Sequence, residues 1–177
     1  DKLVSALVAA APLSRVAHAQ TKSMAWRDVD RVEFRSPELS QRLWHAGLAG
    51  AMSAAVMPPE GLEWAGLHTK WRVYRYREGQ GFGPHFDEAD VDPATALRSH
   101  YTMLLYCSAV SSGGETVFYK SKGREVLAVK PEPGLVLVHA QGAACLLHEG
   151  RPVGRGGDKW VLRSDVMVAK SAPPAAT

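Results

Sequence analysis

The chain has 177 residues, of which 46% are hydrophobic and 22% charged, as expected for a globular domain with a substantial core. Its 21 Lys and Arg against 18 Asp and Glu leave a net charge of +3, which is mild and scattered rather than concentrated in a basic stripe typical of nucleic-acid binding. Two cysteines, Cys107 and Cys145, cannot build a disulfide framework, and no apolar run reaches the roughly 18 residues of a membrane-spanning helix.

The first element expected along the chain is a helix over residues 1–12. The apolar positions that would share one stripe of this helix are Leu3, Leu7 and Ala10. The alternative is a secretory leader, because Ala17-His18-Ala19 resembles a signal-peptidase site. We favour the helix, since Arg15 interrupts the approach to that site.

A second helix has clearer boundaries. Ser36 is a suitable N-cap, Pro37 suits the first helical position, and Glu38 complements the helix dipole. The apolar residues on and beside one stripe of this helix are Leu39, Leu43, Ala46 and Trp44. We expect the helix to end near Gly47 and Gly50.

From residue 69 onward, short strand-like runs alternate with turn residues, which favours a β-sandwich or barrel. The predicted strands cover residues 70–77, 100–110, 115–120, 125–131, 134–140, 144–149 and 159–170. Because the later strands carry apolar residues at both odd and even positions, and so on both faces, we expect the helices to cover one outer face of the sheet. The chain is predicted to form a single domain, with helical support and edge strands in residues 1–68, the β core in 69–168 and a tail in 169–177.

The segment "PHFDEADVD" (84–92) places His85 and Asp87 two positions apart. Side chains at positions i and i+2 of a strand project from the same face, so these two would converge on one point. A converging imidazole and carboxylate can bind a divalent metal. They can equally form an ordinary hydrogen-bonded surface pair.

His148 is the best third ligand among the remaining histidines. It follows the apolar run "AACLL" and is expected to end a buried strand, where a ligand would be held rigidly. Two histidines and one carboxylate form the facial triad of non-haem Fe(II) oxygenases, although zinc enzymes also use such sets. The other histidines are interpreted as ordinary core or surface residues, namely His18, His45, His68, His100 and His139.

Lys159 lies eleven positions after His148, and the glycine-rich segment between them would turn the chain back toward the same pocket. An unpaired buried charge is very costly, so a buried lysine needs an anionic partner, which a dicarboxylate cosubstrate would provide. The alternative is a surface lysine on an edge strand. The apolar residues "WVL" that follow Lys159 weaken that alternative.

These blocks together resemble a known family. The segments "YREGQGFGPHFDE", "YTMLLYC", "GGETVFY", "PEPGLVLVHA" and "LLHEGRPVGRGGDKWVLRSDVMV" are similar to successive blocks of the 2-oxoglutarate- and Fe(II)-dependent dioxygenases, prolyl 4-hydroxylase-like branch. The similarity runs from about residue 70 to 168, whereas residues 1–68 match only loosely. The spacing from His148 to Lys159 looks about one residue longer than is common in the family, which we assign to an extra glycine in "GRGGD".

The resemblance implies a mainly β fold with supporting helices, a double-stranded β-helix (jelly roll, cupin-like) packed against N-terminal α-helices. It implies Fe(II) bound by His85, Asp87 and His148, and 2-oxoglutarate paired through its far carboxylate with Lys159. O2 would be the second cosubstrate and ascorbate a further candidate cofactor. The implied products are a hydroxylated substrate, succinate and CO2.

Three further residues match family positions around the cosubstrate pocket. Tyr76, nine positions before His85, would line this pocket, and Tyr106 and Thr116 occupy matching positions on the core strands. A tyrosine hydroxyl suits such a site because it is a donor on a rigid apolar ring. For all three residues the alternative is core packing.

The resemblance also indicates the substrate, a prolyl residue in a peptide or protein. The loop over residues 88–100 is expected to border the substrate entrance and to move, with its acidic residues Asp90 and Asp92 equally interpretable as merely solvated. One alternative is a dioxygenase that removes alkyl groups from nucleic acid. The positive charge permits this activity, but the chain lacks the paired-arginine pattern of that group. Others are a non-catalytic metal-binding jelly roll, or a zinc hydrolase, which would leave Lys159 and "GGET" unexplained.

Overall fold

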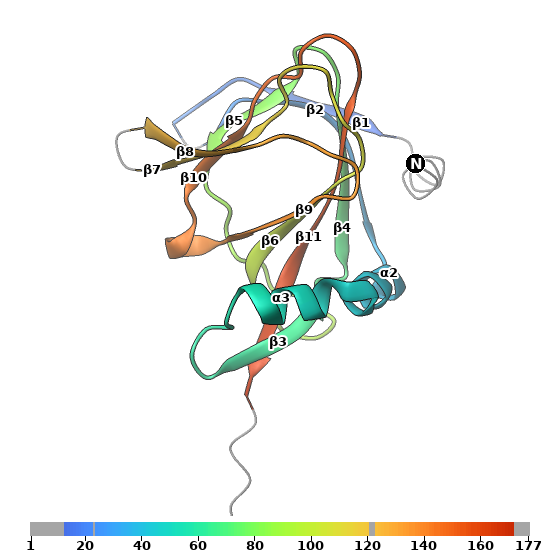
Figure 1. Ribbon diagram of the computed structural model, residues 1–177, viewed down its shortest axis with the longest axis vertical. Coiled ribbons are helices and arrows are strands. Elements are labelled where there is room, and N and C mark those ends of the chain that lie inside the picture. Colours follow the sequence, from blue (N-terminus) through green and yellow to red (C-terminus); the bar gives the residue numbers. More distant parts are fainter. Residues whose placement is uncertain (1–12, 23, 121–122, 172–177) are drawn as a thin grey trace, which may run out of the picture.

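The computed structural model describes residues 13–22, 24–120 and 123–171, and this part of the chain is mainly β (Figure 1). The strands are β1 (Ser14–His18), β2 (Arg27–Arg35), β3 (Leu62–Leu67), β4 (Lys70–Tyr76), β5 (Gly81–His85), β6 (Arg98–Tyr106), β7 (Thr116–Lys120), β8 (Arg124–Val129), β9 (Val136–Ala140), β10 (Leu147–Gly150) and β11 (Lys159–Lys170). The helical segments are α2 (Pro37–Leu43), the π-helical turn η1 (Trp44–Leu48), α3 (Ala49–Ala55) and the short 3-10 turn η3 (Gly142–Ala144). The helix predicted over residues 1–12 lies outside the described residues.

The strands form one antiparallel sheet that curls on itself. Its order is β8-β7-β10-β5-β2-β4-β11-β6-β9, with β1 paired to β2 and β3 paired to β11. Figure 1 shows the consequence: β5, β7, β8 and β10 face β6, β9 and β11 across the middle of the molecule. Strands that are distant in the sequence therefore line one shared interior.

Alternation along the central strands separates two hydrophobic cores. On β4, Tyr74 and Tyr76 belong to the core inside the curl, whereas Trp71 and Val73 pack in a second core together with apolar residues of the helices. Leu162 of β11 lies in the second core as well. This arrangement confirms that the helices cover one outer face of the sheet, and it explains why both faces of the central strands are apolar.

The N-terminal third of the chain contributes an interior strand, contrary to the prediction of helices and edge strands there. Strand β2 lies between β5 and β4. Its carboxylates are neutralised by the neighbouring strand, because Arg75 lies 2.7 Å from Asp30 and Arg72 lies 2.9 Å from Glu33. The dense charges that concealed this strand in the sequence are cross-strand ion pairs in the fold.

The predicted start of the second helix is confirmed, and the helical backbone is broken at Gly47, the first of the two glycines predicted to end it. The Ser36 Oγ accepts a hydrogen bond of 3.1 Å from the backbone N–H of Leu39, and Pro37 occupies the first turn. The turn η1 follows α2 and leads into a separate helix, α3, which ends at Ala55. Gly47 adopts φ 132° within η1, a non-helical conformation open to glycine, so it kinks the chain between the two helices.

The loop before β6 is fastened to the fold rather than merely solvated. The carboxylate of Asp92 is buried and accepts hydrogen bonds from the backbone N–H and the hydroxyl of Thr69, at 3.1 and 2.7 Å. The Asp90 carboxylate pairs with the ammonium of Lys70. The interpretation of these two aspartates as solvated residues is therefore wrong.

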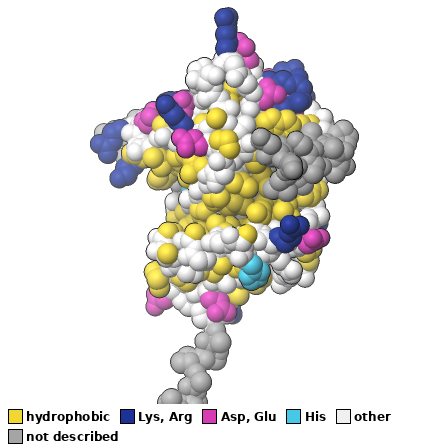
Figure 2. Space-filling model, turned by 45° about the vertical axis from the view of Figure 1, so that its right-hand side comes forward, with side chains coloured by type: hydrophobic (Ala, Val, Ile, Leu, Met, Phe, Trp, Pro, Cys, Tyr) yellow, Lys and Arg dark blue, Asp and Glu magenta, His cyan; other side chains and the backbone are white. Residues whose placement is uncertain are grey.

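Hydrophobic side chains also gather on the outside of the molecule, as the band across one face in Figure 2 shows. Both cysteines are free, with Cys145 buried and Cys107 half-buried. In the described part of the chain, no helix has both the length and the apolar character needed to cross a membrane.

Candidate metal centre

Three predicted ligands meet where β5 and β10 pair inside the curl. His85 ends β5 and is the direct cross-strand partner of His148 on β10, while Asp87 follows two residues after His85. The Asp87 carboxylate oxygens lie 3.8 Å from Nε2 of His85 and 3.7 Å from Nε2 of His148. One ligand atom from each of the three residues lies within 4.8 Å of the others. The structure therefore brings this set together at one point.

Backbone carbonyls fix the orientation of both imidazoles. The Nδ1 of His85 lies 2.8 Å from the carbonyl oxygen of Gly83, and the Nδ1 of His148 lies 2.9 Å from that of Leu146. A carbonyl can only accept, so each Nδ1 carries the proton and donates it there. Each Nε2 then keeps its lone pair toward Asp87, which is the arrangement that metal-binding histidines require.

Two neighbouring side chains hold the Asp87 carboxylate. The Thr102 hydroxyl donates a 2.7 Å hydrogen bond to Oδ2, and the Arg163 guanidinium lies 3.1 Å from Oδ1. Burial acts to raise the pKa of Asp87, but Arg163 and His148 outweigh it and hold that pKa below its usual range. The carboxylate is therefore ionised throughout the neutral range.

Both imidazoles are neutral at neutral pH. Burial, aided by the proximity of His148, lowers the pKa of His85 to about 3. Burial also lowers the pKa of His148. A metal displaces protons from its ligands, so an ionised carboxylate beside two neutral imidazoles is the form ready to bind a cation.

Lys159 reaches the same pocket from the first position of β11. It is 3% exposed, and in the described residues no carboxylate lies within ion-pair distance of its ammonium group. Burial lowers the pKa of Lys159 to about 8, with Glu115 opposing that shift from a distance. Lys159 thus brings into the pocket a buried cation that has no carboxylate within ion-pair distance among the described residues.

The three remaining predicted residues surround this ammonium group. Tyr76 is the cross-strand partner of Lys159, whose Nζ lies 5.3 Å from the centre of its ring. The Tyr106 hydroxyl donates a 2.7 Å hydrogen bond to Oγ1 of Thr116, and the ring of Tyr106 lies 5.5 Å from the same Nζ. Tyr76 and Thr116 line the pocket, and Tyr106 is joined to it through the hydrogen bond to Thr116.

Two residues of the pocket, Arg163 and His139, lie outside the set of site residues predicted from the sequence. The sequence predicts His139 as an ordinary core or surface histidine. The Nε2 of His139 lies 3.6 Å from Oδ2 of Asp87, and Arg163 contacts the other oxygen of the same carboxylate. The parity of β11 offered a signal for Arg163, because residues 159, 161 and 163 share one face and all line the pocket.

Comparison with known sequences identifies relatives for this region. The family described as the 2OG-Fe(II) oxygenase superfamily matches residues 71–164. Probable prolyl 4-hydroxylase 11 of Arabidopsis thaliana is 36% identical over 83 residues, which cover 47% of this chain and 26% of that protein. Probable prolyl 4-hydroxylase 6 of the same plant is 34% identical over 111 residues, 50% of this chain and 38% of that protein. The chain thus spans well under half the length of these curated relatives.

Comparison with solved structures bears on the fold. The prolyl hydroxylase of Trichoplax adhaerens, solved with a hypoxia inducible factor oxygen degradation domain peptide fragment, superposes with a TM-score of 0.65. This superposition covers 94% of this chain and 75% of that one, at 16% sequence identity. At this identity the likeness concerns architecture alone, and it confirms the predicted jelly roll.

Proposed function

Because the chain belongs to the 2OG-Fe(II) oxygenase superfamily, we propose that it is an Fe(II)- and 2-oxoglutarate-dependent dioxygenase that hydroxylates a prolyl residue in a peptide or protein, releasing succinate and CO2. One observation supports this most directly: the ligand atoms of His85, Asp87 and His148 lie within 4.8 Å of one another in the pocket that Lys159 enters. Because the chain spans only part of its curated relatives, its activity as well as its substrate is part of this proposal.

The donor set fits ferrous iron. Two imidazole nitrogens and one carboxylate are the ligands of the facial triad, and three protein ligands leave open positions for other molecules. The backbone hydrogen bonds of His85 and His148 hold their Nε2 lone pairs ready, and Thr102 with Arg163 keeps the Asp87 carboxylate ionised and oriented. The bound iron and 2-oxoglutarate together would supply the activation of O2, which no side chain can perform.

Lys159 would bind the far carboxylate of 2-oxoglutarate. The ammonium group is buried and has no carboxylate within ion-pair distance in the described part of the chain, so a cosubstrate carboxylate would relieve the cost of its burial. The Tyr106 hydroxyl gives its proton to Thr116, which leaves the proton of the Thr116 hydroxyl free for the same carboxylate. Tyr76 would orient the cosubstrate by packing against it.

Apolar walls would keep bulk water from the reacting atoms. Tyr76, Phe82 and Val161 line the same pocket as the candidate metal ligands and Lys159. Water exclusion strengthens the charge pairing of the cosubstrate and protects reactive species from side reactions. Substrate would therefore have to approach from the side of the metal ligands, where the loop over residues 88–100 leaves β5.

The substrate proposal draws on the relatives. Two curated relatives are named as probable prolyl 4-hydroxylases, and one structural neighbour was solved with a peptide fragment. A peptide or protein bearing proline is therefore the first substrate class to examine.

The test is formation of succinate and of a peptide product heavier by about 16 Da, the mass of one oxygen atom, in a screen of proline-containing peptides with Fe(II), 2-oxoglutarate, O2 and ascorbate. We expect product with wild type, none with His148→Ala, and wild-type product with His45→Ala, an exposed histidine outside the pocket. Succinate formation that no prolyl peptide stimulates would contradict the substrate. Equal background in wild type and His148→Ala would contradict an enzyme and favour a binding module.

A further inference from the structure

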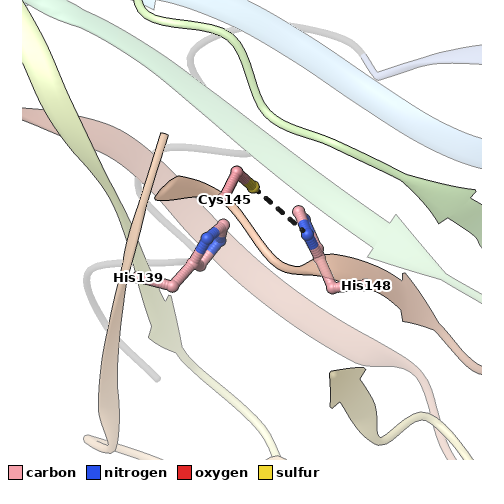
Figure 3. A group of neighbouring side chains, drawn as sticks. All are labelled: His139, Cys145 and His148. Carbon is pink, nitrogen blue, oxygen red and sulfur yellow. Dashed lines mark hydrogen bonds between the residues drawn. The ribbon is translucent and has the colours of Figure 1, made fainter. Parts of the chain in front are cut away.

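A second set of metal-binding side chains lies next to the candidate iron ligands. His139 comes from β9, Cys145 from the segment between η3 and β10, and His148 from β10. One ligand atom from each lies within 4.8 Å of the others. Figure 3 shows the three side chains converging, with the thiol of Cys145 next to the ring of His148. His148 therefore belongs to both sets.

We propose that His139, Cys145 and His148 form a second metal site, which takes Zn(II) or a similar thiolate-preferring cation. We further propose that occupation of this site excludes iron from the first, a clause that rests on the proposed function. Thiolate with imidazole is a ligand set that zinc commonly uses. A site of carboxylate and imidazole suits Fe(II) better, so the two sets differ in the metal that they select.

His139 is the residue that points most clearly to a ligand. Its side chain is 9% exposed, and its Nε2 has no hydrogen-bond partner in the described structure. Its other nitrogen, Nδ1, lies 3.2 Å from the carbonyl oxygen of Ala140, to which it donates. A buried, unprotonated nitrogen without a hydrogen bond, here 3.6 Å from Oδ2 of Asp87, is costly unless something accepts its lone pair, and a metal ion would do so.

Cys145 supplies the sulfur. The residue is 7% exposed, and its Sγ lies 3.8 Å from Nδ1 of His148. The Sγ also accepts a 3.3 Å hydrogen bond from the backbone N–H of Asp87 and lies 3.4 Å from the carbonyl oxygen of Leu146, to which the thiol donates. When the sulfur–metal bond forms, the S–H bond breaks and its proton passes to solvent, with no change of oxidation state.

While its imidazole is neutral, His148 has one lone pair to give, so the two sites compete for it. If the second metal takes Nε2, that nitrogen is no longer available to iron. If the second metal takes Nδ1, the ring proton moves to Nε2, which then cannot bind iron either. Either choice removes one of only three protein ligands from the first site.

Cobalt(II) provides a direct test, since a cobalt–thiolate bond produces a near-ultraviolet charge-transfer band that nitrogen and oxygen ligands do not. Purified wild-type chain is titrated with Co(II) without oxygen, together with Cys145→Ser and the matched control Cys107→Ser. We expect the band in wild type and Cys107→Ser and its loss in Cys145→Ser. The absence of the band from wild type, or its survival in Cys145→Ser, would overturn the proposal.

A second variant covers the case in which Cys145→Ser does not fold. His139→Gln should weaken Zn(II) binding, measured by competition with Co(II), by at least about tenfold, the lower end of what loss of a supporting partner costs a metal site. Unchanged Zn(II) affinity in His139→Gln would overturn the proposal.

Exclusion is tested by adding Zn(II) to the Fe(II)-loaded wild type and measuring iron release by dialysis. Release of one iron per zinc bound supports exclusion, while retention of iron beside a Co(II)-detectable thiolate site refutes it. Neither readout depends on turnover. An inactive protein with a Cys145-dependent cobalt band would contradict the proposed function and leave this site in place.

Discussion

Lys159 is the residue at which burial and positive charge are in most direct conflict. It is 3% exposed, without a carboxylate in ion-pair range among the described residues. Replacing it by methionine keeps the volume and removes the charge. Loss of one partner of a buried charge pair costs about 2–5 kcal/mol, so we expect the half-saturating concentration of 2-oxoglutarate to rise by about 30-fold or more.

The measurement is succinate formation as a function of 2-oxoglutarate concentration in Lys159→Met. The control is Lys170→Met, an exposed lysine at the other end of the same strand, which should match wild type. Equal 2-oxoglutarate dependence in wild type and Lys159→Met would remove Lys159 from the cosubstrate site.

The same lysine predicts how stability depends on pH. Burial lowers its pKa to about 8, whereas a lysine in the unfolded chain titrates near 10.4. Between these values the unfolded chain binds more protons, so the free energy of unfolding rises with pH in this window. Relative to Lys159→Met, the unliganded wild type should gain on the order of 3 kcal/mol from pH 8 to about 10.4.

Urea unfolding of wild type and Lys159→Met at closely spaced pH values measures this difference in the free energy of unfolding. The raised pKa values of the buried tyrosines affect both proteins equally, so their contribution cancels. Burial raises the pKa of Tyr106 to about 12, for example, in wild type and variant alike. A difference that stays flat between pH 8 and 10 would mean that the lysine is not buried as a lone cation.

The sequence could predict which residues meet in the pocket only where spacing or motif constrained them. His85 and Asp87 share a strand face, and Lys159 follows His148 across one turn, so their convergence could be anticipated. His139 carries no such signal, because its approach to Asp87 depends on β9 pairing with β6 rather than with its sequence neighbours. The local hydrophobic periodicity of a sequence does not indicate which strands will pair in the folded sheet.

At the scale of single elements, the N-cap of α2 is open to a clean test. The Ser36 Oγ accepts from the N–H of Leu39 at 3.1 Å, so Ser36→Ala leaves that donor without its partner. We expect the free energy of unfolding to fall by about 1 kcal/mol. Ser53→Ala, at an exposed position inside α3, should cost nothing measurable. Equal unfolding midpoints in urea for Ser36→Ala and Ser53→Ala would refute the cap.

The glycine pair of "GGET" supports a second test, on the turn that enters β7. Gly113 has φ 66°, and a Cβ there would lie 2.3 Å from the carbonyl oxygen of Pro152. Gly134 has φ 87° but open space around it. Gly134→Ala should cost about 1–2 kcal/mol for its backbone conformation alone. Gly113→Ala should cost a further 1–3 kcal/mol, because the Pro152 backbone must move.

Thermal unfolding of both glycine variants decides between these contributions. Equal losses of stability would mean that the positive φ, not the close approach of the segment after β10, explains the glycine.

Strand β7 was predictable from its apolar run after this turn, whereas β2 was not. The cross-strand ion pairs of β2, such as Arg75 with Asp30, cannot be recognised before the sheet is known.

The curl of the sheet is the feature of the whole molecule on which the candidate site depends. It places β5, β7 and β10 across from β9 and β11, so that the candidate ligands and Lys159 share one pocket. Patterning could predict a β-rich fold with one helix-covered face. It could not predict that β2, before the region matched by the family, would lie between β5 and β4 and complete the sheet behind the metal ligands.

Binding of Fe(II) without oxygen, measured by equilibrium dialysis in the presence of 2-oxoglutarate, tests the central claim most directly. We predict one Fe(II) per chain in wild type and in His45→Ala, and affinity lowered by at least about a hundredfold in Asp87→Ala, which lacks one of three protein ligands. Iron bound equally well by wild type and Asp87→Ala would contradict the account.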